Sequence, residues 1–216
     1  MLKLRNDMIL IGCDFSINKP AATVFFNNQY LFYGWPYNLP KRLNPVYDTG
    51  AVNLIERTDV KEKGKDTSEQ MRYQVTNAAY LSDLIVDSLK QYLGKDTYFA
   101  FEGISYGSSG DVILQLGGYK YMIMEKLRNY MPMENIFTYA PTTVKKTANC
   151  SKRGLGKNAV IESFINNAHN NTLKSAINDD KESFMKKGMK NYIDHLDDLI
   201  DSYWVLQTLR DKEIFK

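Results

Sequence analysis

The stretch Met8-Ile-Leu-Ile-Gly-Cys-Asp-Phe-Ser16 decides how the rest of this chain is interpreted. Residues 8–13 are apolar or small, which is typical of a short buried β-strand, and Asp14 follows directly. A carboxylate at the end of a buried strand is costly unless it is paired, hydrogen-bonded or bound to a metal. In open α/β sheets, ligands gather at strand ends. Asp14 therefore either caps the next turn or belongs to a ligand- or metal-binding site. Acidic residues further along the chain help to decide between these two interpretations.

The composition excludes several classes of protein. The chain has 216 residues, of which 44% are hydrophobic and 25% charged, as in an ordinary globular domain. It has no apolar run near the roughly 18 residues of a membrane span, so we expect no membrane partner. Two cysteines without a CxxC pattern indicate a reducing compartment and no structural zinc. The N-terminus does not fit a signal peptide, so a cytoplasmic location is expected.

The net charge of +3 is too small to indicate a nucleic-acid partner by itself. Such a partner has to be inferred from where the charges lie along the chain.

The order of the predicted elements is that of an α/β protein. The first three strands are expected to form an antiparallel meander with a hairpin turn at Asn27-Asn28. Two further strands follow, and a third short one is conceivable at Val52–Arg57. The strands are expected at Met8–Cys13, Ala21–Asn27, Gln29–Gly34, Thr97–Phe101 and Ile136–Ala140. The helices are expected at Thr67–Leu93, Asp111–Met131, Asn158–Ala168 and Asn191–Leu209. The helix at Thr67–Leu93 is expected to begin with a capping box formed by Thr67 and Gln70.

Glu102 repeats the pattern of Asp14, because it follows the apolar strand Thr97–Phe101 directly. A glycine-rich loop comes next, but it lacks the Gly-Lys-Ser/Thr of a Walker loop and is weak evidence for a phosphate site. Tyr106 in this loop either stacks on a base or packs locally.

The segment from Pro141 to Lys157 is the one strongly basic stretch, and it contains no acidic residue. Such a stretch is often only a solvated face. Here the glycines and the hydroxyl side chains among the basic residues favour contact with a phosphate backbone. The basic residues are Lys145, Lys146, Lys152, Arg153 and Lys157.

The last predicted helix carries four aspartates, which form either a solvated acidic face or a cation site. Two carboxylates about 4 Å apart repel by about 4 kcal/mol at an effective dielectric of about 20, so a cluster of them favours a cation. Asp198 and Asp201 are three residues apart, which suits two ligands on adjacent turns. The other two aspartates are Asp194 and Asp197.

Carboxylates without histidine or cysteine partners suit hard cations such as Mg²⁺ or Mn²⁺. Two such ions can position a water and stabilise the leaving oxygen of a phosphodiester. Together with a basic segment, this predicts metal-dependent phosphodiester hydrolysis through Asp14, Glu102, Asp198 and Asp201.

The order and spacing of these motifs resemble the RuvC-type Holliday junction resolvases of the ribonuclease-H-like nuclease superfamily. The opening CDFSINKPAATVFF is similar to the branch carried by bacteriophages. The matching stretches are IGCDFS, FAFEGIS, YAPTTVKK, GLGKNAVIESF and DDLIDSYWVL.

The resemblance implies a ribonuclease-H-like fold, in which a mixed five-stranded sheet with a three-strand meander is flanked by helices. It also implies a homodimer that resolves four-way DNA junctions by paired symmetric nicks. Two Mg²⁺ ions, which Mn²⁺ could replace, would be held by the four carboxylates. Lys145 and Lys157 would contact junction phosphates near the cleaved bond, so Lys157 counts with the catalytic residues.

The chain departs from the family pattern in a few places. Ser16 stands where the family usually has glycine, and Ser105 stands where it has a stacking aromatic, with Tyr106 one position late. Residues 35–66 and 169–190 are longer than the family core needs and are expected as insertions in a single domain spanning 1–216. Asp197 or Asp194 could replace Asp198 as the ligand.

Three other functions stay open at this point. One is another nuclease of the superfamily, acting on RNA–DNA hybrids or flaps. Another is a non-catalytic nucleic-acid-binding protein on the same scaffold, although the complete carboxylate set argues against it. An actin-like ATPase also begins with a strand that ends in Asp, but it needs a second glycine-rich phosphate loop that the sequence lacks.

Overall fold

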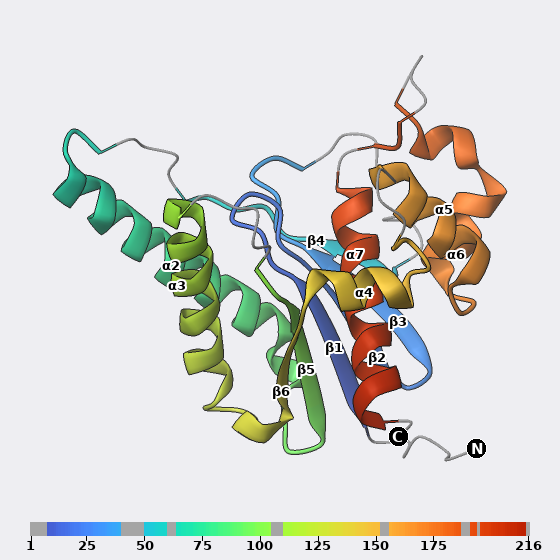
Figure 1. The fold of residues 1–216 in the computed structure, drawn as a ribbon, viewed down its shortest axis with the longest axis horizontal. Helices are drawn as coiled ribbons and strands as arrows, with labels where there is room; N and C mark the ends of the chain where they lie inside the picture. Colours follow the sequence, from blue (N-terminus) through green and yellow to red (C-terminus); the bar gives the residue numbers. More distant parts are fainter. Residues whose placement is uncertain are drawn as a thin grey trace.

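The structure is a computed structural model that describes residues 8–39, 50–59, 64–104, 110–151, 156–186, 191–193 and 195–214. Its centre is a mixed sheet with the strand order β4-β3-β2-β1-β5-β6 (Figure 1). The first three strands pair antiparallel, whereas β1, β5 and β6 run parallel, as do β3 and β4. The strands are β1 (Ile9–Asp14), β2 (Ala21–Phe26), β3 (Gln29–Gly34), β4 (Val52–Leu54), β5 (Thr97–Glu102) and β6 (Ile136–Tyr139).

The predicted fold class, a mixed sheet flanked by helices, is confirmed. Asn27 and Asn28 both have positive φ, 49° and 61°, as a tight hairpin turn between β2 and β3 requires. The sheet gains a sixth strand from β4, which lies at the start of Val52–Arg57, where the sequence left a further short strand open. This strand is short, and its pairing with the edge of β3 is a long-range contact that no local pattern reveals.

Helices cover both faces of the sheet (Figure 1). One face packs against α2 (Thr67–Leu89) and α3 (Gly110–Leu127). On the other face α7 (Leu196–Leu209) lies along the sheet, and α4 (Pro141–Thr147), α5 (Lys157–Asn167) and α6 (Thr172–Asp179) gather around it. Short helical turns complete the chain: η1 (Lys90–Tyr92), η2 (Met133–Asn135), η3 (Lys181–Phe184) and the π-helical η4 (Arg210–Ile214). No helix among the described residues has the length and apolarity to cross a membrane.

Residues of β1 alternate between the two apolar layers. Ile11 and Cys13 pack toward α2 and α3, whereas Leu10 packs toward α7. Side chains two residues apart point to the same face, so Gly12 and Asp14 lie on the α7 side. A Cβ atom added at Gly12 would be 2.2 Å from the backbone nitrogen of Leu206, so α7 rests directly on the strand.

Three predicted elements differ from the structure. The last helix begins at Leu196, not Asn191, because the backbone at His195 is left-handed, with φ of 71°. The basic stretch Pro141–Lys157, for which no helix was predicted, begins with the helix α4. Pro141 is its first residue, a position that proline readily takes in a helix. Asp66, not Thr67, caps α2, and its side chain accepts a hydrogen bond of 2.8 Å from the backbone of Glu69.

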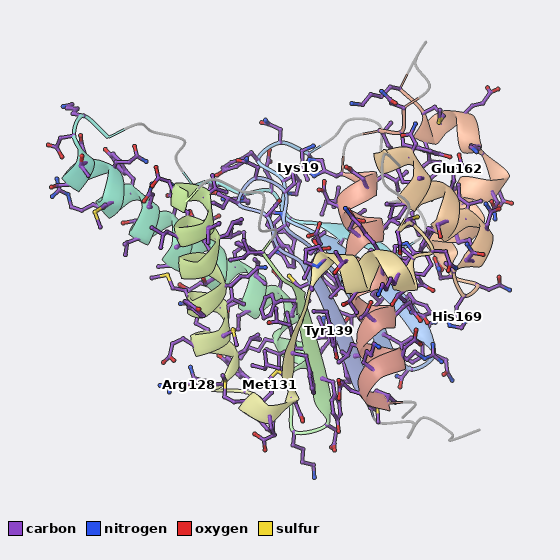
Figure 2. The ribbon with its side chains drawn as sticks, viewed as in Figure 1. Lys19, Arg128, Met131, Tyr139, Glu162 and His169 are labelled. Atoms are coloured by element: carbon purple, nitrogen blue, oxygen red, sulfur yellow. The ribbon has the colours of Figure 1, made fainter. Side chains whose placement is uncertain are left out.

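The two long segments contribute to the packed structure. Leu173, Ile177 and Phe184 are buried in the core on the α7 side. Glu162 of α5, labelled in Figure 2, accepts hydrogen bonds from Lys181 at 2.8 Å and Tyr192 at 2.5 Å. These contacts hold the segment after α6 against α5.

A buried arginine ties the other long segment to the loop that follows Asp14. Arg57 donates from Nη1 to the backbone oxygen of Ile17 at 2.5 Å and from Nε to Asp59 at 2.9 Å. Its guanidinium also lies 4.0 Å from the centre of the Tyr37 ring. The single-domain organisation, and the status of both segments as insertions, stay predictions.

Candidate metal and nucleic-acid site

Asp14 and Glu102 meet because their strands are neighbours and run parallel. Cys13 pairs with Phe101 in the ladder, so the residue after each ends its strand at the same edge of the sheet. In β5, Ala100 packs on the α7 side and Phe101 on the opposite side, so alternation places Glu102 on the α7 side with Asp14. The two carboxyl groups are close enough to affect each other's pKa.

Helix α7 brings two further carboxylates to this edge. Asp198 and Asp201, three residues apart, fall on adjacent turns, and both act electrostatically on Asp14. Asp198 is 9% exposed, and its Oδ2 is 3.9 Å from Nδ1 of His195. Asp197 is also buried, about 100° from Asp198 and about 40° from Asp201 around the helix, but the carboxylates that act on Asp14 are Asp201, Glu102 and Asp198. Asp194, the other alternative ligand, lies outside the described residues.

The clustering raises the pKa of the carboxyl groups. The pKa of Asp14 lies well above its ordinary value, chiefly because burial disfavours the charged form, and then because of repulsion by Asp201, Glu102 and Asp198. Burial also raises the pKa of Glu102, against the opposing pull of Lys120 and Lys145. A cluster that resists ionisation in this way is stabilised by any added positive charge.

The donor chemistry fits a hard divalent cation, since all four groups are carboxylates and each favours the charged form once a cation is near. Within the part of the chain that the structure describes, however, no three His, Cys, Asp or Glu side chains are already arranged to hold a metal ion. The ends of β1 and β5 and the start of α7 still bring the four carboxylates together, and small side-chain rotations would change the ligand geometry without moving these elements. The ligand assignment stays a prediction.

The structure adds a residue that the sequence analysis missed. Lys120 of α3 is 8% exposed, and its Nζ donates a hydrogen bond to the backbone oxygen of Glu102. Its position was detectable, because Tyr119, Ile123 and Leu127 form the buried stripe of α3 and Lys120 lies within that stripe. A lysine at a core-facing helical position is unusual unless it is paired.

A cavity of about 390 Å³ opens beside the carboxylates. It is bounded by residues from four helices, from β5 and from the segments flanking them. Those that bear on its chemistry are Glu102, Lys120, Lys145, Asp201 and Trp204.

Of the predicted DNA-binding residues, Lys145 reaches this cavity. The backbone nitrogen of Gly103 donates to the oxygen of Tyr139 at 2.7 Å, so the end of β6 and the start of α4 lie beside the end of β5. Lys145 and Lys146 are both exposed on α4, and Lys145 lines the cavity.

The other predicted DNA contacts are Lys157, Lys152, Arg153 and Tyr106. Lys157 begins α5, directly after Gly156, which also lines the cavity. Lys152, Arg153 and Tyr106 lie outside the described residues.

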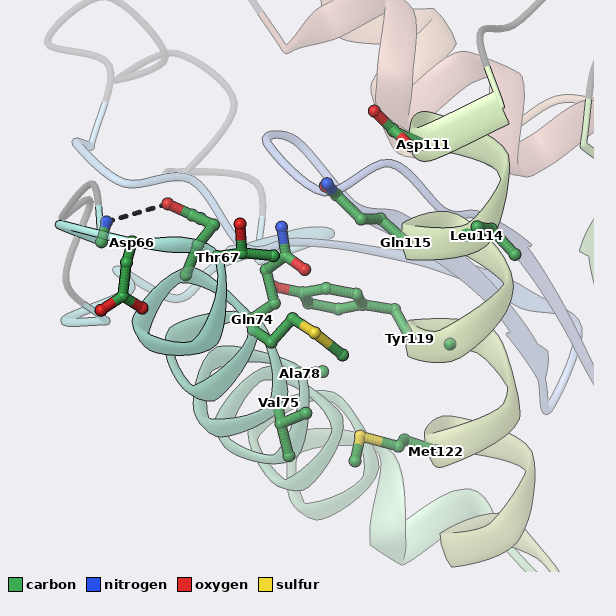
Figure 3. A pocket seen from close by; sticks show the side chains of 14 residues that line it. Asp66, Thr67, Gln74, Val75, Ala78, Asp111, Leu114, Gln115, Tyr119 and Met122 are labelled. Carbon is green, nitrogen blue, oxygen red and sulfur yellow. Dashed lines mark hydrogen bonds between the residues drawn. The ribbon is translucent and has the colours of Figure 1, made fainter.

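A larger groove of about 830 Å³ lies between α2 and α3, as Figure 3 shows. Apolar side chains line much of it, including Met71, Val75, Leu114 and Met122. Met71 is 60% exposed and Leu114 is 76% exposed. The described residues that line this groove include none of the four carboxylates, so it is separate from the candidate site.

Comparison with solved structures shows the fold. The chain is similar to Thermus thermophilus RuvC in complex with a Holliday junction substrate, with a TM-score of 0.50, 10% identity, and coverage of 94% of this chain and 95% of that chain. Another structure of Thermus thermophilus RuvC also gives a TM-score of 0.50 and 10% identity, covering 94% of this chain and 96% of that one.

The yeast mitochondrial Holliday junction resolvase Ydc2 gives a TM-score of 0.47 and 11% identity, covering 95% of this chain and 82% of that one. No protein-family model matches the sequence, and no curated protein matches it. The likeness to the two RuvC structures confirms the predicted RuvC-type fold over almost the whole chain.

Proposed function

We propose that this chain is a metal-dependent, structure-selective endonuclease that resolves four-way DNA junctions by paired, symmetric nicks. The observation that carries the proposal is the meeting of Asp14, Glu102, Asp198 and Asp201 at one edge of the sheet, beside a cavity that Lys145 also lines. The fold supports the choice of substrate, because a RuvC structure of the same fold is a complex with a Holliday junction.

Asp14, Glu102, Asp198 and Asp201 would hold the metal, proposed as two Mg²⁺ ions that Mn²⁺ could replace. Bound divalent ions would supply an activated water and stabilise the charge that develops on the leaving 3′ oxygen. The expected products carry 5′ phosphates and 3′ hydroxyls.

The basic residues would hold the DNA backbone. Lys145 lines the same cavity as Asp201, so its ammonium would contact the phosphate next to the cleaved bond. Lys157 is proposed for a second contact near that bond, because α5 starts at the rim of the cavity. Lys146, Lys152 and Arg153 would bind more distant phosphates, and Tyr106 would stack on a base.

Paired nicks in a symmetric junction need two active sites, so we propose a homodimer. Most homodimers have twofold symmetry, with the same surface patch on both partners. The groove between α2 and α3 (Figure 3) is our candidate for this patch, because large apolar side chains such as Val75 and Leu114 are exposed there. Exposed apolar groups in one groove are typical of an interaction surface.

The test uses purified protein with a labelled synthetic four-way junction and a linear duplex of the same sequence. Each substrate is incubated with Mg²⁺, with Mn²⁺ and with chelator. Paired nicks in the junction alone, dependent on metal, are the expected result. Cleavage of duplex, flap or RNA–DNA hybrid would keep the metal site but reject junction selectivity. Tight junction binding without cleavage under any metal would reject the catalytic proposal. Membership of the phage branch and the cytoplasmic location stay predictions.

A further inference from the structure

A buried cation lies where the proposed ligands converge. Lys120 is 8% exposed, although lysine is rarely buried without a partner. It extends from α3, whose apolar stripe packs on the face of the sheet opposite α7. Asp198 and Asp201 come to this edge of the sheet from α7 on one face. The ammonium of Lys120 reaches the same edge from α3 on the opposite face.

Lys120 contacts one strand-end acid and acts electrostatically on both. Its Nζ donates to the backbone oxygen of Glu102 and so holds the last peptide of β5. Its positive charge favours the ionised forms of Asp14 and Glu102, in opposition to burial. Lys120 also lines the same cavity as Glu102 and Asp201.

Helix α3 is fixed at this point, which distinguishes Lys120 from a mobile surface lysine. The ring of Tyr119 lies 5.8 Å from that of Phe15, the residue after Asp14. Ile123 and Leu127 are fully buried further along the same stripe. Because the helix is held on both sides of Lys120, its ammonium has little freedom to follow a DNA backbone.

We propose that Lys120 is a positioning residue and an internal counter-charge of the carboxylate cluster. It orients Glu102 through the end of β5, and its charge weakens the attraction of the four carboxylates for divalent cations. The inference rests on the proposed metal-dependent function and deepens it. The Lys120 ammonium would be a buried cation of the site, in addition to Lys145, which is exposed on the surface.

The two roles give a signature that loss of stability alone would not produce. Removing the charge in Lys120→Met should make the site more negative and so tighten Mg²⁺ and Mn²⁺ binding by about tenfold. The same change releases the end of β5, so the turnover number for junction cleavage should fall by about tenfold or more, with little change in KM. Lys120→Arg keeps the charge and should restore the metal affinity of the wild type.

The experiment is calorimetric titration of the full-length protein with Mn²⁺ and with Mg²⁺, together with thermal melting in chelator and in metal. Lys126→Met is the matched control, because Lys126 lies on the same helix and pairs with Asp83 of α2, away from the cluster. The control should bind metal as the wild type does. The Tm of Lys120→Met should fall in chelator and recover more on adding metal than the wild type does.

Metal affinity of Lys120→Met equal to or weaker than that of the wild type would overturn the inference. An equal loss of Tm with and without metal would also overturn it, because that is the mark of a purely structural residue. If Lys120→Met does not fold in chelator, Lys120→Gln is titrated instead, since it removes the charge and keeps a donor for the carbonyl. Wild-type affinity in that variant would then reject the proposal. A wild-type protein that binds neither ion would reject the proposed function itself.

Discussion

Gly12 of β1 lies directly beneath Leu206 of α7, and an added Cβ atom would be 2.2 Å from the Leu206 backbone nitrogen and 2.5 Å from the Ser202 oxygen. Because these are backbone atoms, no side-chain rotation can relieve such a contact. The absence of a side chain at Gly12 thus lets α7 lie flat on β1. That contact brings Asp201, one residue before Ser202, to the end of the strand, where Asp14 is.

Gly12→Ala should therefore damage both stability and the site. We expect the free energy of unfolding to fall by roughly 3 kcal/mol, because α7 has to move off the strand. Urea denaturation measures this loss, and cleavage at a temperature where the variant is folded should fall with it. Gly94→Ala is the control, because a Cβ there meets nothing within 4 Å. Equal stabilities of Gly12→Ala and the control would contradict the close packing.

Asp14→Asn should abolish cleavage while leaving junction binding largely intact. Asp14 is at the centre of the four carboxylates, so its loss removes a proposed ligand without altering the basic surface. We expect the cleavage rate to fall by at least about a thousandfold, measured in single-turnover assays beside a gel-shift titration. Undiminished cleavage by this variant would reject the site assignment.

The stability of the metal-free protein should decrease as the pH rises from the ordinary carboxyl range toward neutrality. The folded state raises the pKa of Asp14 and of Glu102, so within that window it retains protons that the unfolded chain has lost. Stability then falls with rising pH. Thermal melting in chelator across this range is the measurement.

Asp14→Asn is the control for this pH dependence, since it removes one of the two groups and should flatten the curve. Added Mg²⁺ should also flatten it, because a cation favours the ionised forms. Stability that rises with pH over this window in chelator would contradict the clustering.

Lys145 and Lys146 are neighbours on α4 that should behave differently. Lys145 lines the cavity with Glu102 and Asp201, whereas Lys146 is exposed beside it. Lys145→Ala is expected to lower the turnover number by about tenfold or more, as loss of a transition-state contact does. Lys146→Ala should leave turnover unchanged, weaken binding across all sequences and reduce the salt slope by about 1. Identical effects of the two changes would show that neither lysine faces the cleaved bond.

Met71→Glu should convert the proposed dimer to a monomer. Met71 is 60% exposed in the groove between α2 and α3, and a buried carboxylate at a symmetric interface would face its own copy. Analytical ultracentrifugation of the wild type and the variant measures the change. Met133→Glu, in η2 at 45% exposure and away from the groove, is the matched control and should remain dimeric. A wild-type monomer, or a dimeric Met71→Glu, would reject this surface.

Local patterns in the sequence were enough to predict the strands that carry Asp14 and Glu102. A short apolar run, an Asn-Asn turn and a carboxylate at a strand end are all decided by neighbouring residues. The separation of Asp198 and Asp201 by three residues likewise predicted that they share a helix face. The RuvC-type fold was expected from the resemblance of these motifs, in their order and spacing, to that family.

Only the tertiary structure decided which other groups meet those acids. The start of α7 at Leu196 depends on the left-handed backbone at His195, which no periodicity reveals. Lys120 reaches Glu102 from the far side of the sheet, and the groove at Met71 exists only because α2 and α3 pack together. Periodicity and turn chemistry act over a few residues, so the sequence alone predicted most strands and the long helices, but not α4 or α6. The approach of Lys120 to Glu102 and the groove between α2 and α3 result from packing between residues far apart in the sequence, which only the folded structure reveals.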